Sequence, residues 1–76
     1  MRELEQDIQR ARKRLGQNVR KARAAEGLSL ADVAERTGET EQRLAQIEAG
    51  ECDVPFDTLV HRARTLHTTL SALFTP

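Results

Sequence analysis

GLSLADVAERTGETEQRLAQIEAG, residues 27–50, is the stretch that decides the fold, because two short amphipathic helices flank a glycine within it. Ser29 precedes the first helix, and Asp32 three residues later completes a capping box that satisfies free backbone amides at the helix start. We expect this helix to end near Thr37, since Gly38 tolerates the left-handed backbone that terminates helices. Its buried stripe consists of Leu30, Val33 and Ala34.

The second helix of the stretch starts after Thr40 and stops at Gly50. Helical periodicity assigns its inner face to Leu44 and Ile47, with Ala45 beside them. The residues left facing outward are Glu41, Gln42, Arg43 and Gln46. Together the two helices form a helix-turn-helix, a motif that holds its second helix where it can lie in a DNA major groove.

Length and composition leave room for one small, all-α domain. A chain of 76 residues buries only about 60% of its unfolded surface, so we expect a single core and a gain in stability from a partner subunit. The lone Cys52 has no internal disulfide partner, which indicates a reducing compartment. No apolar run approaches the ~20 residues that span a bilayer, and the charged N-terminus does not resemble a signal peptide. We therefore expect a cytoplasmic protein with no membrane partner.

Acidic and basic side chains balance, twelve against twelve, but they are segregated along the chain. The basic side chains of residues 10–23 are Arg10, Arg12, Lys13, Arg14, Arg20, Lys21 and Arg23, with no acid among them. The acids of residues 26–57 are Glu26, Asp32, Glu35, Glu39, Glu41, Glu48, Glu51, Asp53 and Asp57, against only two arginines. Because a phosphate contact normally needs a cation or a free backbone amide, the acidity around the second helix bears directly on whether it contacts DNA.

Residues 3–26 are expected to form one long helix ahead of the motif. Its apolar residues recur at intervals of three and four: Leu4, Ile8, Ala11, Leu15, Val19 and Ala22. Gly16 interrupts this pattern at a cost of ~1 kcal/mol relative to Ala, so a kink or break there is an open alternative. A compact helix-turn-helix needs a first helix only from about Leu15, so the earlier apolar residues extend beyond the core. We expect a dimer or partner contact formed by Leu4, Ile8, Ala11 and Leu15.

Beyond Gly50, an acidic loop leads to two further helices. Pro55 suits a first helical position and Asp57 favours the positive end of the helix dipole. The expected buried stripe is Leu59, Val60, Ala63 and Leu66. Thr68 or Thr69 then caps a short last helix that holds Leu70, Leu73 and Phe74.

The sequence contains no pattern typical of catalysis, metal binding or cofactor binding. His61 and His67 lie six residues apart, so they do not share a helix face, and no Cys or acid completes a metal-ligand set with them. Phosphate-binding glycine loops, paired catalytic carboxylates and nucleophile-base arrangements are missing as well. We therefore expect neither an enzyme nor a metal, cofactor or small-molecule ligand.

From Leu15 to Phe74 the chain resembles the phage repressor and Cro-like (xenobiotic-response-element) helix-turn-helix family. The residues that match the opening pattern of the family are Leu15, Gly16, Val19, Arg20, Ala22 and Arg23. Those that match its helix-turn-helix pattern are Gly27, Leu28, Ser29, Val33, Ala34, Gly38, Leu44, Ile47, Glu48 and Gly50, and the ending P-x-D-T-L matches residues 55–59. The resemblance implies a lambda-repressor-like bundle of about five helices, with a domain over residues 15–76 and a helical extension over 1–14. It also implies a buried ion pair between Arg23 and Glu48.

The chain departs from the family pattern where DNA contact is made. Leu30 replaces a glutamine that usually reaches the DNA backbone, Glu39 replaces a usually buried valine, and Ala49 replaces a polar residue. The loop over residues 51–53 is acidic where the family is often basic.

Two functional hypotheses remain open. In the first, the protein is a repressor-like, dimeric transcriptional regulator that binds double-stranded DNA. Base edges would then be read by Gln42, Arg43, Gln46 and Glu41, and phosphates would be contacted by Ser29, Thr40, Arg14 and Arg20. In the second, the same fold is a protein-binding module, such as an antirepressor, a regulatory subunit or a filament-binding domain, whose acidic face does not bind DNA.

Overall fold

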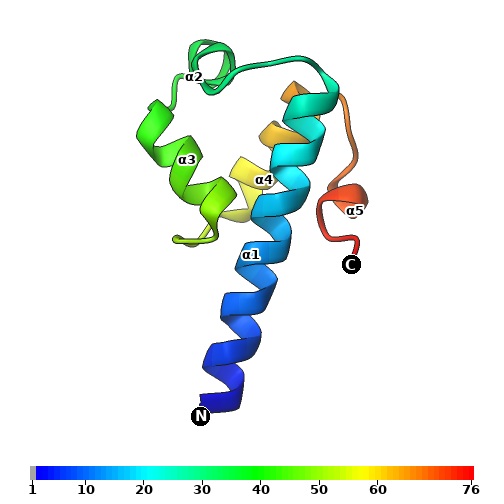
Figure 1. Ribbon diagram of the computed structural model, residues 1–76. Helices are drawn as coiled ribbons and strands as arrows, with labels where there is room; N and C mark the ends of the chain where they lie inside the picture. Colours follow the sequence, from blue (N-terminus) through cyan, green and yellow to red (C-terminus); the bar gives the residue numbers. More distant parts are fainter. Residues whose placement is uncertain (1) are drawn as a thin grey trace.

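A computed structural model describes residues 2–76, which form five α-helices around one core (Figure 1). The helices are α1 (Arg2–Ala25), α2 (Leu30–Thr37), α3 (Glu41–Ala49), α4 (Phe56–Thr65) and α5 (Leu70–Leu73). The predicted all-α bundle of about five helices is confirmed. The long first helix begins and ends one residue earlier than expected, and it runs through Gly16 without a break.

The helix-turn-helix forms as its local signals predict. Ser29 caps α2 with the expected capping box, and Thr40 caps α3. Gly38 and Gly50 end the two helices with φ angles of 77° and 73°, a backbone region that side-chain-bearing residues rarely adopt. Thr69 caps α5, but Pro55 is the N-cap of α4 and not its first helical residue.

The core joins all five helices. Its most deeply buried residues are Val19, Val33, Leu44, Ile47, Leu66 and Leu73. Three expectations for buried positions are wrong. Ala45 is exposed, and Val60 and Phe74 keep 42% and 52% of their surface. Ala45 and Val60 lie off the helix faces that bury Leu44 and Ile47 on α3 and Leu59 and Ala63 on α4, and Phe74 follows the last residue of α5.

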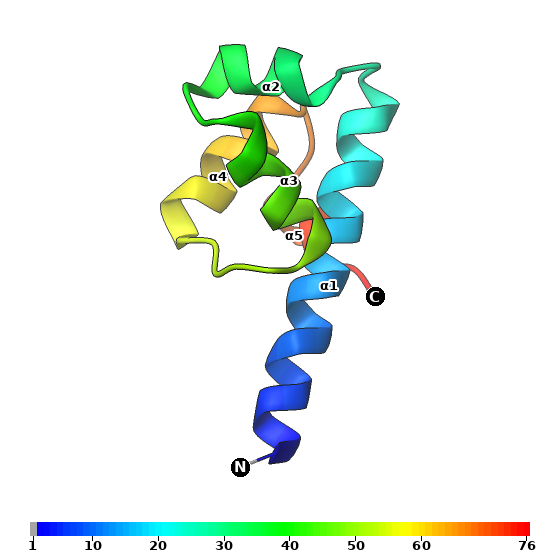
Figure 2. The ribbon, with the colours of Figure 1, turned by 60° about the vertical axis from the view of Figure 1, so that its left-hand side comes forward.

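Gly16 and Gly50 allow α1 and α3 to cross closely. A Cβ atom on Gly16 would lie 2.4 Å from the carbonyl oxygen of Glu48, and one on Gly50 would lie 2.8 Å from the Cα of Lys13. The cost of a glycine inside a helix is therefore offset by this approach, which positions α3 against α1. The N-terminal part of α1 continues past this crossing and projects from the body (Figures 1 and 2).

Candidate nucleic-acid interface

The outward face of α3 is the candidate contact surface. Its exposed residues are Glu41, Gln42, Ala45 and Ala49, whereas Arg43 and Gln46 are half-buried beside them. Four of these six are the polar side chains that the sequence analysis assigned to base edges. Gln42 and Gln46 face away from the buried Leu44 and Ile47, whereas Glu41 and Arg43 lie at the edges of the buried face. Ala45 was expected on the inner face of the helix, whereas Ala49 was already identified as replacing a polar residue at the contact surface.

The caps of α2 and α3 place two hydroxyl groups on the surface next to this face. The Ser29 hydroxyl oxygen accepts a hydrogen bond from the Asp32 amide at 3.0 Å, and the Thr40 hydroxyl oxygen accepts one from the Arg43 amide at 3.1 Å. A hydroxyl used as an acceptor retains its own hydrogen for donation. The exposed Thr40 cap is therefore suited to donate to a phosphate oxygen, whereas the Ser29 hydroxyl is also engaged with the Asp32 carboxylate.

The capping box also sets the charge state of Asp32. The Ser29 backbone amide donates to the Asp32 carboxylate at 2.8 Å. This bond, followed by the one from the Ser29 side chain, lowers the pKa of Asp32 below its ordinary value of 3.8. Asp32 is thus a carboxylate at neutral pH and stabilises the start of α2.

Arg20 is an exposed first-helix cation that lies next to α3. It lines a shallow groove that also includes Leu30 at the start of α2 and Ala45 and Ala49 on α3. Its guanidinium therefore borders the outward face, where a phosphate beside the major groove would lie.

Arg14 lies on a different face of α1. It is one helical turn from Asn18, whose amide donates to the carbonyl oxygens of Leu73 and Thr75 in the C-terminal segment. At ~100° per residue, Arg14 and Arg20 are about 120° apart around the helix. The structure therefore does not bring Arg14 together with the other residues proposed to contact phosphates.

Arg43 is connected to the loop between α3 and α4. Its guanidinium donates to the carbonyl oxygen of Asp53 at 3.0 Å, and the carboxylate of the same Asp53 pairs with Arg12 on α1. The sequence analysis gave Arg43 a base-reading role and overlooked these contacts, which link residues far apart in the chain. Arg43 in the free protein therefore holds the acidic loop against α3 and α1.

The implied pair between Arg23 and Glu48 forms at the crossing of α1 and α3. The Nε and Nη2 atoms of Arg23 donate to the two carboxylate oxygens at 2.6 and 2.9 Å, and Nη1 donates to the carbonyl oxygen of Leu28. The side chains are 17% and 10% exposed. The hydrogen bonds to Glu48 raise the pKa of Arg23. This bidentate geometry fixes the position of α3 relative to α1.

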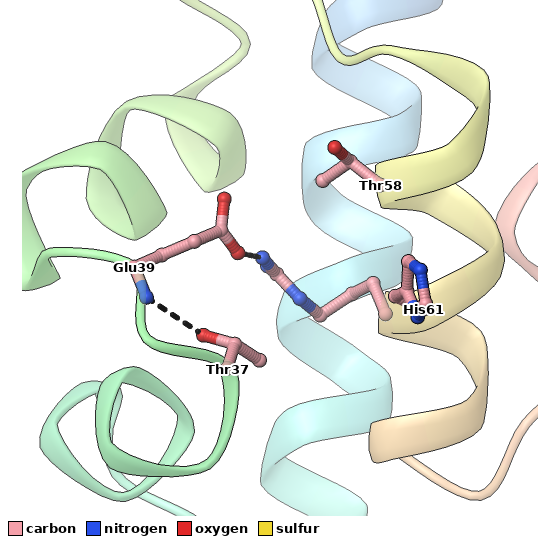
Figure 3. A pocket seen from close by; sticks show the side chains of 5 residues that line it. Thr37, Glu39, Thr58 and His61 are labelled. Carbon is pink, nitrogen blue, oxygen red and sulfur yellow. Dashed lines mark hydrogen bonds and ion pairs between the residues drawn. The ribbon is translucent and has the colours of Figure 1, made fainter.

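Glu39 in the turn forms a second internal ion pair that the sequence analysis missed. It pairs with Arg62 of α4, a residue that is only 3% exposed. Figure 3 shows the pocket around this pair, with Thr37 and Glu39 on the side of the turn and Thr58 and His61 on α4. The buried Arg62 explains why an acid occupies position 39 in the turn. The residue pattern alone gave no reason to connect these two positions.

These pairs change the electrostatic character expected for the interface. Glu39, Glu48 and Asp53 are each neutralised by an arginine of the same chain. Within residues 2–76, Glu41 and Glu51 are the acids at the two ends of α3 for which the structure shows no ion pair. The outward face of α3 is therefore less acidic than the sequence indicates.

Two other features of the described chain are relevant to site chemistry. No helix in residues 2–76 combines the length and apolar character needed to cross a membrane. The same residues contain no cluster of three or more His, Cys, Asp and Glu side chains placed to hold a metal ion.

Comparisons with known proteins agree with this architecture. A family described as a helix-turn-helix domain matches residues 14–73. The structure is similar to the restriction-modification controller protein C.AhdI from Aeromonas hydrophila, with a TM-score of 0.76 and 27% identity over 82% of this chain and 94% of that one. It is also similar to the DNA-binding domain of BldD, with a TM-score of 0.81 and 25% identity over 88% and 97% of the two chains.

A third similar structure is an HTH_3 family transcriptional regulator from Vibrio cholerae, with a TM-score of 0.80 and 31% identity. That match covers 88% of this chain and 38% of the longer regulator. No curated protein matches the sequence. The chain therefore belongs to the helix-turn-helix domain family and has the DNA-binding fold of transcriptional regulators.

Proposed function

We propose that this protein is a repressor-like transcriptional regulator that acts as a dimer and inserts α3 into the major groove of double-stranded DNA. The observation that carries the proposal is the grouping of Gln42, Gln46, the Thr40 hydroxyl and Arg20 around one exposed helix face. This grouping provides both kinds of contact that recognition needs, since amides read base edges and hydroxyls and guanidinium groups hold phosphates. The similarity to a restriction-modification controller protein, to the DNA-binding domain of BldD and to a transcriptional regulator supports it.

Gln42 and Gln46 are the residues most suited to sequence discrimination. A glutamine amide can donate to and accept from the N7 and N6 atoms of adenine at the same time, and such a contact is worth ~1 to 3 kcal/mol. Glu41 on the same face accepts only from a cytosine amine and otherwise repels phosphates. The resulting specificity rests on few contacts, so a dimer that binds two half-sites strengthens it.

The test is a duplex selected from random sequence by the wild-type protein, titrated by fluorescence anisotropy. We expect Gln42→Ala to weaken binding to that duplex by about 5- to 150-fold while leaving binding to random duplexes unchanged. Gln17→Ala is the matched control, because Gln17 is an exposed glutamine on α1. Equal losses for both variants, or equal losses on selected and random duplexes, would contradict the assigned role of Gln42.

One observation favours the protein-binding alternative. Glu41 is exposed at the start of α3 and makes no ion pair in the described chain, so the face retains a negative charge where DNA would approach. Under the DNA-binding proposal, Glu41→Gln tightens binding to all duplexes by up to about fivefold at low salt, because a unit repulsion in water is ~1 kcal/mol. If wild type and Glu41→Gln both fail to bind any selected duplex at low salt, the protein-binding function becomes the better proposal.

A further inference from the structure

The projecting part of α1 carries an apolar stripe with no cover from the body. Leu4 and Ile8 are 61% and 42% exposed, and every residue from 2 to 11 is exposed. An isolated helix of this length is marginal in water, since most helical stability comes from packing of an apolar face. The stripe therefore requires an occupant.

A groove at the base of this projection continues the stripe onto the body. Its apolar lining is formed by Ile8, Ala11, Leu15, Val54, Leu59 and Phe74. Its volume is about 240 Å³, which exceeds the ~150 Å³ in which an apolar cavity holds a benzene ring. The groove can thus accept one large aliphatic side chain beside the exposed Phe74.

The spacing of the stripe is symmetric along the chain. Leu4, Ile8, Ala11 and Leu15 are separated by four, three and four residues, so the order is the same when read backwards about the point between residues 9 and 10. A second copy laid antiparallel with its two-fold axis at that point brings Leu4 opposite the partner's Leu15. It also brings Ile8 opposite the partner's Ala11. In this register Leu4 enters the groove of the other copy.

The charges that flank the stripe have the same symmetry with opposite signs. Glu5 and Asp7 flank its first half, and Arg12 and Arg14 flank its second half. An antiparallel pair places Asp7 beside the partner's Arg14 and Glu5 beside the partner's Arg12, which gives four attractive contacts per dimer. A parallel pair gives only the contact of Asp7 with the partner's Arg12, twice per dimer. Flanking charges of this kind set partner choice and orientation between paired helices.

We infer that the occupant of the stripe and groove is a second copy of this chain, with the two projecting helices paired antiparallel about residues 9 and 10. The inference deepens the dimer of the proposed function and rests on it. It assigns Arg14 to the dimer contact and not to a DNA phosphate, in agreement with its position away from α3.

Charge reversal with rescue tests the pairing on the full chain. Asp7→Lys and Arg14→Glu each reverse two contacts per dimer, so we expect each to weaken self-association about tenfold in analytical ultracentrifugation. A mixture of the two variants restores attraction at both contacts and is expected to form heterodimers with wild-type affinity. Lys21→Glu, an exposed reversal on the body half of α1, is the control and should leave association unchanged. Single variants that dimerise like wild type, or a mixture that is not rescued, would overturn the inference.

Cysteine cross-linking in a Cys52→Ser background tests the orientation. Asp7→Cys mixed with Arg14→Cys should give a disulfide-linked heterodimer, while a parallel pair would instead link Asp7→Cys to Arg12→Cys, and that result would overturn the inference. A wild-type protein that is monomeric at all concentrations would remove both the inference and the dimer. DNA binding through α3 would remain separately testable by the anisotropy titration, which does not depend on self-association.

Discussion

At the residue scale, internal ion pairs help to fix the packing of the domain. Their contribution is important because the core is small. Arg23 and Glu48 share a bidentate contact between α1 and α3, and both side chains are largely buried. A buried pair adds less stability than its attraction suggests, but removing one member leaves an uncompensated charge inside the protein. The pair therefore acts mainly to fix the packing of the contact helix.

Glu48→Ala is expected to lower the free energy of unfolding by roughly 3 kcal/mol, because it leaves the Arg23 guanidinium buried without its carboxylate. Natural domains are stable by only about 5 to 15 kcal/mol, so this loss should be visible as a large drop in Tm. Glu51→Ala, an exposed acid at the end of the same helix, should melt like wild type. Similar melts for Glu48→Ala and Glu51→Ala would contradict the structural role of the pair.

The lowered pKa of Asp32 predicts that the stability of the domain depends on pH. Its pKa is lowered in the folded state by the Ser29 amide, so its contribution to stability is complete above the ordinary value of 3.8 and is lost as the pH falls through the lowered value. Wild type should therefore have a higher Tm than Asp32→Ala near neutral pH, and the difference should vanish in strong acid. A difference that persists below the lowered pKa would mean that the carboxylate charge is not what stabilises α2.

Several side-chain contacts could not be predicted from the sequence, and the reason is physical. The caps at Ser29 and Thr40 are local, since donor and acceptor lie within one turn, and residue order alone predicts them. The pairs of Glu39 with Arg62 and of Asp53 with Arg12 join residues 23 and 41 positions apart. Such contacts depend on how helices pack, which a periodic pattern does not specify.

At the scale of elements, the close crossing of α1 and α3 positions the contact face. Sequence reasoning recognised Gly16 only as a cost to the helix, because propensity describes a residue in its own helix and not its neighbours. The structure shows what this reasoning missed: the backbones of α1 and α3 approach so closely at Gly16 that a side chain has no room there. Likewise, the limits of α2 and α3 were predictable from caps and glycines, whereas the exposure of Ala45 was not.

Gly16→Ala is expected to destabilise the domain by about 1 to 3 kcal/mol although alanine is the better helix former. The added Cβ would meet the carbonyl oxygens of Ile47 and Glu48 at 2.6 and 2.4 Å, so α3 must shift. Gln17→Ala, at an exposed neighbouring position, should leave stability unchanged or raise it slightly. Chemical denaturation of both variants provides the measurement, and a stabilised Gly16→Ala would show that α1 and α3 are further apart.

At the scale of the whole molecule, the protein consists of a compact body from which the N-terminal part of α1 projects. The body and the projecting part have separate roles in our account. The body holds α3 against α1 and leaves one face of it exposed, with Ser29, Thr40 and Arg20 beside that face. The projecting N-terminal part of α1 carries the exposed Leu4 and Ile8. We therefore assign the proposed DNA contact and the proposed self-association to different surfaces.

The most direct test of the central claim is a map of backbone amide chemical shifts as a selected DNA duplex is added to the labelled protein. Our account predicts that the largest changes fall on residues 40–49, the start of α2 and the region around Arg20, with little change at α5. Changes centred on α5 or the α4 surface, or no change at low salt, would contradict the claim that the exposed face of α3 binds DNA.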